Sequence, residues 1–277
     1  MNRLTTERRT KVLRALVEGN SIRSTVRMTG VAKNTITKLL VDVGEACAKY
    51  HAEHVVDVPS RRIQCDEIWS FCYAKRKNVP LDKQGQFGYG DVWTWTAIDA
   101  DSKLCVSWVI GTREADTALE FMEDVASRLQ DRVQLTTDGL KTYLITVEEA
   151  FGSNIDYAML KKIYGRDPGA DETRYSPAVC TGIKIETVQG NPDPAHINTS
   201  YVERQNLTMR MGMRRFTRLT NAFSKKVLNL SAAIALHFMY YNFVRVHQTI
   251  KTTPAVASGL ADHEWDIEEI VGLLDSN

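Results

Sequence analysis

The order of strand and helix patterns in the middle of the chain constrains the fold most. Two apolar runs flank the turn residues Asp99–Ser102, which predicts an antiparallel hairpin. One strand pattern precedes this hairpin, and helical and strand patterns alternate after it. The predicted strands lie at 63–71, 92–98, 104–110, 133–137 and 157–164, and the predicted helices at 112–129 and 142–151. This order predicts an α/β protein.

The order of strands and helices along the chain reduces the number of possible folds further. Three strands, a helix and a strand that ends at Asp138 form the opening order of an RNase H-like fold. Periodicity alone does not separate this fold from other α/β sheets. We expect the α/β domain to span residues 61–250. Four prolines and four glycines lie between 165 and 195, where we expect a loop-rich insertion with a short strand near 183–188.

The N-terminal segment is basic and helical. The first 41 residues carry nine Lys or Arg and two acids, so their charge is +7 while the whole chain carries +1. Helical patterns separated by Gly19-Asn20 and Gly30 predict three helices in the helix-turn-helix layout. We predict an all-α helix-turn-helix domain over 1–48 that binds DNA, followed by an extended linker over 49–60. A helical bundle with a solvated basic face is the alternative.

The last of these three helices is the predicted recognition helix. In a helix-turn-helix domain the first residues of this helix face base edges in the major groove. Short polar and basic side chains occupy those positions and could bind bases and phosphates. The predicted DNA contacts are Lys33, Asn34, Thr35, Thr37 and Lys38.

Three acidic residues are candidates for a metal site. Asp66 lies within a predicted strand, Asp138 at the end of another and Glu203 on a later helix, so the three could meet at one edge of the sheet. Phosphodiester chemistry uses divalent ions, and Mg²⁺ prefers carboxylate ligands. Because side chains alternate across a strand, we expect Asp66 and Glu67 on opposite faces, so that only one serves the site. Taken singly, an acid is more commonly a surface charge.

The local sequences around these acids form three motifs. They are Gln64-Cys65-Asp66-Glu67-Ile68-Trp69, Thr136-Thr137-Asp138-Gly139 followed by Tyr143, and Tyr201-Val202-Glu203-Arg204-Gln205-Asn206. A later pair of runs consists of Tyr240-Tyr241-Asn242-Phe243-Val244-Arg245-Val246-His247-Gln248 and Thr253-Pro254-Ala255. The three motifs resemble those of DDE insertion-sequence transposases, closest to the group named after the first bacterial insertion sequence. The later runs resemble the end of transposase and integrase catalytic domains, so the resemblance covers most of residues 1–260.

The resemblance implies a retroviral-integrase-like catalytic domain in which Asp66, Asp138 and Glu203 are catalytic and bind two Mg²⁺ or Mn²⁺ ions. It implies nicking at the 3′ ends of terminal inverted repeats, strand transfer into target DNA, and a homo-oligomer on paired ends. The 64 residues between Asp138 and Glu203 exceed the spacing in retroviral integrases. The 165–195 insertion accounts for the excess, and the next candidates for the third acid are Glu186 and Asp193.

A basic segment follows the third acid, with no acidic residue from Arg204 to Lys226. On a helix, Glu203, Asn206 and Arg210 share a face. Such a run beside a metal site could neutralise DNA phosphates, and a solvated helix face is the alternative. The candidate DNA contacts are Arg204, Asn206, Arg210, Arg214, Arg215, Arg218 and, less strongly, His247.

The C-terminal segment 251–277 is an acidic amphipathic tail. Residues 262–277 hold six acids and no Lys or Arg, with an apolar set that includes Trp265 and Ile270. The tail could dock on its own domain or on a second protomer, and the pattern favours neither.

Cysteine usage and hydropathy exclude other classes. Five cysteines without CxxC spacing indicate neither a disulfide framework nor a zinc ribbon. The spacing of His51, His54, Cys65 and Cys72 matches no common zinc finger. We expect no signal peptide, because the N-terminal segment is charged from Arg3 onward and has no apolar core. We expect no membrane span, because the most apolar stretch, 232–241, is short and contains a histidine. The expected location is the bacterial cytoplasm, with the protein bound to the nucleoid.

Three functions follow from these patterns. The first is a DDE transposase that acts on double-stranded DNA and cuts and joins it with divalent metal. A helix-turn-helix regulator with an inactive catalytic fold would need no carboxylate cluster. An RNase H-like nuclease would share the acids but would cleave without joining.

Overall fold

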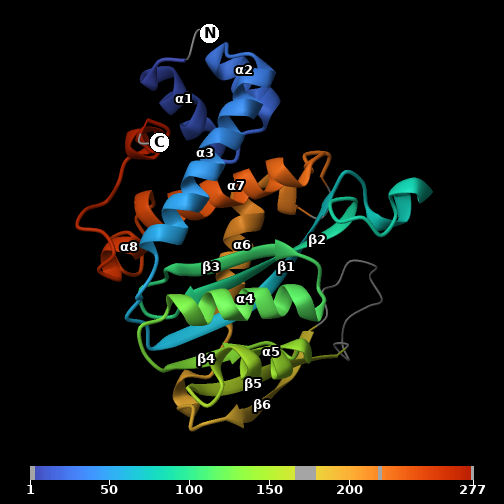
Figure 1. Cartoon of the computed structure of the whole chain (residues 1–277), viewed down its shortest axis with the longest axis vertical. Helices are drawn as coiled ribbons and strands as arrows, with labels where there is room; N and C mark the ends of the chain where they lie inside the picture. The colour runs from blue at the N-terminus through green and yellow to red at the C-terminus, as the bar shows by residue number, and fades with distance from the viewer. Residues whose placement is uncertain (1–3, 166–178, 218–219, 276–277) are drawn as a thin grey trace.

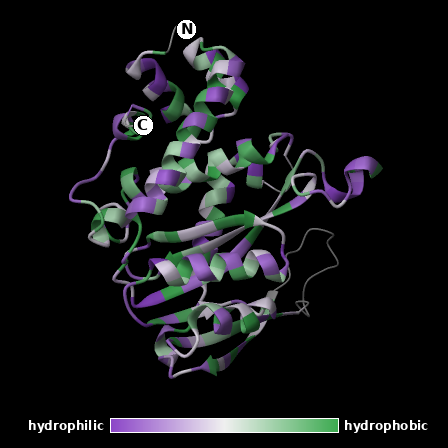
Figure 2. Cartoon of the chain, viewed as in Figure 1, coloured by the Kyte–Doolittle hydropathy of each residue, from purple (hydrophilic) through white to green (hydrophobic). Residues whose placement is uncertain are grey.

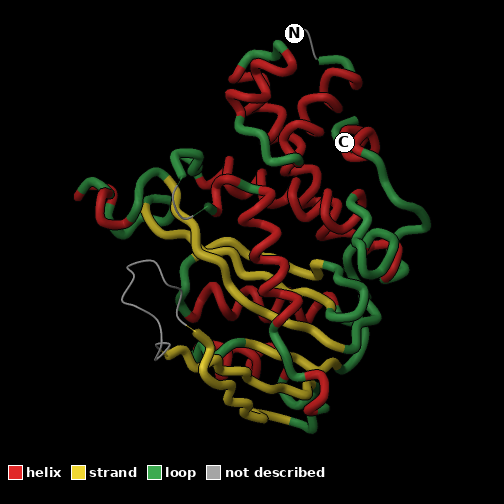
Figure 3. The backbone as a smooth tube through the Cα atoms, turned by 180° about the vertical axis from the view of Figure 1, so that it is seen from behind, coloured by secondary structure: helices red, strands yellow, loops and turns green. Residues whose placement is uncertain are grey.

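A computed structural model describes residues 4–165, 179–217 and 220–275. The described part contains one six-stranded mixed sheet in the order β3-β2-β1-β4-β5-β6 (Figures 1 and 3). Strands β1, β4 and β5 are parallel, and β2, β3 and β6 run antiparallel to their neighbours. The strands are β1 (Arg62–Cys72), β2 (Gly90–Asp99), β3 (Cys105–Gly111), β4 (Val133–Thr137), β5 (Ile155–Gly165) and β6 (Val179–Gln189). The α/β class predicted from the sequence is confirmed.

Helices cover both faces of this sheet. Helices α4 and α5 pack together on one face, and α6 lies on the other, against β1 and β2 (Figures 1 and 3). The longer helices are α1 (Thr6–Val17), α2 (Ile22–Thr29), α3 (Lys33–His54), α4 (Ala115–Arg128), α5 (Thr142–Phe151), α6 (Ser200–Gly212) and α7 (Val227–Met239). Two short helices near the C-terminus are α8 (Pro254–Ala257) and α9 (Ile267–Gly272).

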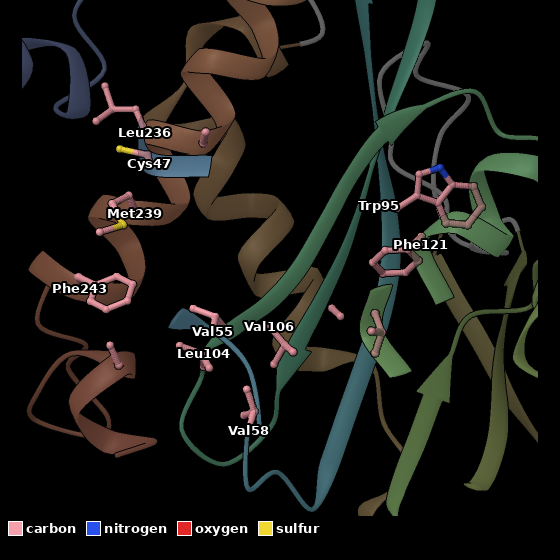
Figure 4. Close-up of a cluster of buried hydrophobic side chains, with 14 of the residues drawn as sticks. Cys47, Val55, Val58, Trp95, Leu104, Val106, Phe121, Leu236, Met239 and Phe243 are labelled. Carbon is pink, nitrogen blue, oxygen red and sulfur yellow. The ribbon is translucent and has the colours of Figure 1, made fainter. Parts of the chain in front are cut away.

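Alternation along β1 divides the apolar core between the two faces. Ile68 and Cys72 pack in a cluster with Val202 of α6 and Phe238 of α7. The larger cluster lies on the other face and continues into the N-terminal helices. Figure 4 shows Cys47 of α3 beside α7. One core therefore joins the N-terminal helices to the sheet domain.

The segment 165–195 differs from the sequence-based expectation. Strand β6 covers eleven residues and pairs with β5 along its length, where only a short strand within a loop was predicted. The alternation of Ile183, Ile185 and Thr187 with polar residues is short, and the glycines and prolines on either side obscured it. Residues 166–178 lie outside the described part of the chain.

Helix α2 begins and ends where the local chemistry predicts. The side chain of Ser21 accepts a hydrogen bond from the N–H of Ser24 and caps α2. Gly30 ends α2 with a φ of 67°, a left-handed conformation that glycine adopts without steric cost. The predicted linker 49–60 is wrong over its first part, because α3 continues to His54. Tyr50 and His51 extend the buried face of the helix, so only residues 55–60 of the predicted linker lie outside it.

The close approach of α3 and α7 depends on a glycine. A Cβ atom on Gly44 would lie 2.4 Å from the Cα of Ala232 in α7. We therefore expect Gly44→Ala to lower the free energy of unfolding by about 2 kcal/mol, although alanine favours helix. Gly272→Ala is the control, because a Cβ there meets no atom within 4 Å, and we expect it to be neutral. Urea unfolding of both variants measures the difference, and equal stabilities would contradict the tight α3–α7 contact.

The acidic tail docks within its own chain. Helix α9 packs on α1 and α3, and Ile267, Ile270 and Val271 join the large core cluster. Arg9 of α1 forms an ion pair with Asp275 at 3.2 Å. Of the two docking modes left open by the sequence, the structure shows the tail on its own N-terminal helices.

The segment Val227–Val244 is apolar and long enough to cross a membrane by length and composition alone. It is the core helix α7 with the π-helical turn that follows it, and 61% of the segment is buried. Figure 2 shows α7 mostly in the hydrophobic colours. The side chain of Asn242 in this turn bonds both backbone groups of Cys105 at 2.9 Å, which ties the segment to β3.

Candidate metal centre and DNA interface

Three carboxylates converge where strand β4 ends. Strand β1 pairs with β4 only as far as Cys65, opposite Thr137. Asp66 and Glu67 therefore lie just beyond the pairing, next to Asp138, which follows β4. The ligand atoms of these three acids all lie within 4.8 Å of one another, and they form the only such group among the described residues. Carboxylates at this separation form a site that could hold a metal ion.

The expectation that only one of Asp66 and Glu67 can serve the site is wrong. Their Cβ atoms alternate across β1, but Oδ1 of Asp66 turns along the strand and accepts the N–H of Glu67 at 2.8 Å. Because β4 has ended, no strand separates the two side chains at this edge, and Asp138 reaches both. The N–H of Leu140 donates to Asp138 at 2.9 Å and fixes that carboxylate.

Glu67 is buried and held by two partners. Its side chain is 1% exposed, and Oε1 accepts a hydrogen bond from Nε of Arg113 at 2.9 Å. The hydroxyl of Tyr143 donates to the other oxygen at 3.3 Å. Arg113 thus offsets one of the three negative charges in the cluster.

The cluster shifts the protonation of its members. Burial, followed by the charges of Asp138 and Glu203, raises the pKa of Asp66 to about 7. Burial and the charges of Asp138 and Asp66 raise the pKa of Glu67 to about 8, against the opposing effect of Arg113. Mutual repulsion of this kind is what a bound cation would relieve.

Glu203 faces the same pocket but lies outside the close cluster. The pocket has a volume of about 890 Å³ and is lined by Asp66, Asp138 and Glu203, among others. Both oxygens of Glu203 lie 2.5 Å from Nζ of Lys162 on β5, and one accepts the hydroxyl of Thr199 at 2.7 Å. In this structure, therefore, the third predicted acid is paired with a lysine.

Helix α6 is tied directly to the strand that carries Asp66. The side-chain oxygen of Gln64 accepts the N–H groups of Tyr201 and Val202 at 2.9 and 3.2 Å, and so satisfies the first turn of the helix. One turn further on, Asn206 donates to Oδ2 of Asp66 at 2.8 Å. These hydrogen bonds hold α6 against β1, so that the face of the helix with Glu203 is turned towards the acidic cluster.

The two alternative third acids lie elsewhere. Glu186 on β6 pairs with Lys161 at 2.8 Å, and Asp193 accepts the N–H of Ala195 at 2.9 Å. Neither lines the pocket, whereas Glu203 does.

The predicted DNA contacts fall into separate groups. Lys33, Asn34, Thr35 and Lys38 are exposed at the start of α3, and Thr37 is half-buried there. Lys38 forms an ion pair with Asp42 at 2.7 Å. This end of α3 points away from the sheet (Figure 1).

The basic segment after Glu203 divides between surface and interior. Arg210 and Asn206 line the acidic pocket, while Arg204 and Arg214 are exposed. Arg215 instead donates to the hydroxyl of Ser224 at 3.0 Å, and burial lowers its pKa. Arg218 lies outside the described residues. His247 accepts the N–H of Thr249 at 3.3 Å and does not line the pocket.

Sequence reasoning missed the basic side of the pocket. Thr137 pairs with Met159, so the residues that follow on β5, Lys161 and Lys162, lie beside Asp138. Two lysines at the carboxyl end of a parallel strand next to Asp138 were the available signal. The sequence around Arg113, on the β3–α4 loop, carried no such signal, because its partner Glu67 is 46 residues away.

The shifted pKa values predict how stability depends on pH. An acid whose pKa is higher in the folded state binds more protons there, so its contribution is present at low pH and is lost as pH rises through the folded pKa. We expect the metal-free protein to lose about 4 kcal/mol of stability between pH 6 and pH 9. Thermal unfolding at pH 6, 8 and 9, with and without Mn²⁺, measures this. Mn²⁺ should raise the unfolding temperature more at pH 8 than at pH 6, and a metal effect independent of pH would contradict the prediction.

No protein-family model matches the chain, and no curated protein sequence matches it. Among solved structures, it is similar to the Mos1 transposase paired-end complex with left transposon end, at 13% identity and a TM-score of 0.25, over 57% of this chain and 60% of that chain. A piggyBac transposase synaptic complex with hairpin DNA has 11% identity and a TM-score of 0.41, over 99% of this chain and 71% of that chain. The Mos1 strand transfer complex has 10% identity and a TM-score of 0.26, over 87% and 78%. Scores below 0.5 do not establish an activity.

Proposed function

We propose that the protein is a DNA transposase of the DDE type, with an RNase H-like catalytic domain that nicks DNA ends and joins them to a target. The observation that carries the proposal is the meeting of Asp66 and Asp138 at the end of β4, with Glu203 facing the same open pocket. The antiparallel β1–β2–β3 order, followed by a helix and the parallel strand β4 with Asp138 directly after it, supports the fold.

The residues of the pocket fit a divalent cation. Carboxylate oxygens of Asp66, Glu67 and Asp138 lie within 4.8 Å of one another, and Glu203 faces the same pocket. The buried side-chain oxygen of Asn206 has no hydrogen-bond partner among the described residues. Asp66, Asp138 and Glu203 would hold two Mg²⁺ or Mn²⁺ ions. A bound divalent ion supplies positive charge that stabilises the attacking and leaving oxygens of a phosphodiester reaction.

The surrounding side chains have distinct roles in this proposal. Asn206 positions the Asp66 carboxylate, and Arg113 with Tyr143 holds Glu67. Glu67 is a positioning residue, because its charge is already paired. Lys162 and Arg210 line the pocket and would bind backbone phosphates of the DNA.

Recognition of the DNA ends is assigned to the N-terminal helices. The exposed start of α3, with its Lys33 and Asn34, would enter the major groove of the terminal inverted repeats. The basic charge of this segment supports DNA as the partner. We further propose that the protein acts in the bacterial cytoplasm as a homo-oligomer on paired ends.

A strand-transfer assay tests this function. The protein is incubated with Mg²⁺ or Mn²⁺ and a labelled duplex that carries the inverted repeat flanking its gene, together with a target duplex. We expect nicking at the 3′ ends and a joined product on a denaturing gel. Nicking without joining would favour an RNase H-like nuclease, and binding without nicking would favour a helix-turn-helix regulator.

A further inference from the structure

A second hollow lies at the far end of strand β1. It has a volume of about 590 Å³ and lies between the end of β1 and residues 220–225. We call it the aromatic groove and define it by Phe71, Tyr73, Lys75, Phe223 and Lys225. Among the described residues that line it, none is acidic. Nothing in the proposed cutting and joining chemistry uses these side chains.

Aromatic rings and ammonium groups alternate in this groove. Nζ of Lys225 lies 4.2 Å from the ring centroid of Phe223 and 5.8 Å from that of Tyr73. Nζ of Lys83, which does not line the groove, lies 4.5 Å from the Tyr73 ring. The Phe223 ring stands 4.7 Å from that of Phe71, which forms the buried floor. Rings that stack on bases, next to cations that bind phosphates, are the usual components of single-strand binding sites.

The backbone holds Tyr73 in an unusual conformation. Its φ is 68°, in the left-handed region that bulky residues avoid. The N–H of Tyr73 donates to the carbonyl of Ser224 at 2.8 Å, and Nζ of Lys225 donates to the carbonyl of Tyr73 at 3.3 Å. Two segments distant in sequence thus fix the ring over the groove. Backbone conformations of this kind concentrate at ligand-binding sites.

The groove and the acidic pocket share no lining residue, but both lie along strand β1. Phe71 is five residues beyond Asp66 on one strand, a separation of roughly 16 Å at the usual rise. Between them, the Trp69 ring lies 5.7 Å from that of Phe71, and Trp69 pairs across the sheet with Trp93. The guanidinium of Arg113, which binds Glu67, lies 4.6 Å from the Trp93 ring. A row of rings and cations therefore links the acids to the groove.

We propose that the aromatic groove binds an unpaired stretch of the DNA substrate, with bases stacked on Tyr73 and Phe223 and phosphates bound by Lys75 and Lys225. The proposal rests on the proposed function for the presence of DNA at the acidic pocket. A paired duplex would use the lysines alone, because its bases are already stacked on one another. The aromatic rings therefore favour single-stranded DNA next to the cutting site.

The test is a binding measurement with the full chain in EDTA, so that no nicking occurs. Fluorescence anisotropy compares a labelled single strand with a blunt duplex of the same sequence. We expect Phe223→Leu, which keeps apolar bulk but removes the ring, to weaken single-strand binding about tenfold and to change duplex binding less than twofold. Lys225→Ala should weaken single-strand binding. It should also reduce the slope of log K against log salt concentration by about one, because one fewer counterion is released. The matched control is Lys226→Ala, at an exposed neighbour that does not line the groove.

A second measurement does not depend on how the variants fold. The fluorescence of 2-aminopurine placed within the single strand should be quenched when the wild-type protein binds, because the base stacks on a ring. Equal losses for both forms of DNA, or no quenching, would overturn the proposal. If the groove variants change the binding of neither form of DNA, the groove is not a DNA site, and a contact with a protein becomes the alternative. Because metal is absent, a failure to nick would not affect this test.

Discussion

Asp66→Asn is expected to reduce nicking of a repeat-end duplex about a thousandfold and to leave duplex affinity within twofold. Asparagine keeps the size of the side chain and can still accept the N–H of Glu67, but it removes the negative charge at the centre of the cluster. Charge stabilisation by a metal ion is worth several kcal/mol, which corresponds to this loss in rate. DNA binding should persist, because the exposed start of α3 is far from β1 in the fold. A labelled duplex with Mg²⁺ or Mn²⁺, resolved on a denaturing gel, measures the rate.

Matched carboxylates provide the control for that result. Glu186→Gln breaks an ion pair with Lys161 at the rim of the pocket but removes no residue of the cluster, so we expect near wild-type nicking. Glu203→Gln should behave like Asp66→Asn if Glu203 is the third acid. Full nicking by Asp66→Asn, or a greater loss in Glu186→Gln than in Glu203→Gln, would contradict the assignment of the acids.

The fold could be predicted from sequence where local patterns determine it. The hairpin of β2 and β3, the helix α4 and the strand β4 all lie close to their predicted ranges, because turn residues and apolar periodicity are local signals. The extension of α3 to His54 could not be predicted, because Pro59 suggested an extended connector. The last turns of the helix are stabilised by contacts with residues distant in sequence. One example is the buried hydrogen bond between the His51 ring and the carbonyl of Cys105.

The acidic site was predictable in its parts but not in its geometry. Motifs around Asp66, Asp138 and Glu203 identified the acids, yet the pairing of Glu203 with Lys162 depends on the register of β5. Glu67 was misplaced for a related reason: alternation holds for Cβ atoms, whereas the carboxylates meet past the end of the β1–β4 pairing. Which side chains meet beyond a strand's last partner is a tertiary property.

Residues at the start of α3 are expected to determine which DNA ends the protein selects. Asn34→Ala should reduce the preference for repeat ends over random duplex about tenfold, because a side chain that reads a base edge contributes about 1–3 kcal/mol of discrimination. Lys33→Ala should weaken binding to both duplexes alike and lower the salt slope by about one ion. Competition binding at two salt concentrations separates the two effects.

Point substitutions suit this test better than removal of residues 1–48. The N-terminal helices share one apolar core with the sheet domain, and Gly44 packs against Ala232 at a distance that leaves no room for another atom. Truncation would therefore expose the core and lower stability, whereas Lys33 and Asn34 are exposed and can be changed without unfolding. Thr10→Ala, at a buried position of α1, should leave end selectivity unchanged and serves as the control. Unaltered selectivity in Asn34→Ala and Lys33→Ala together would assign end recognition to another surface, with the basic residues after Glu203 as the next to substitute.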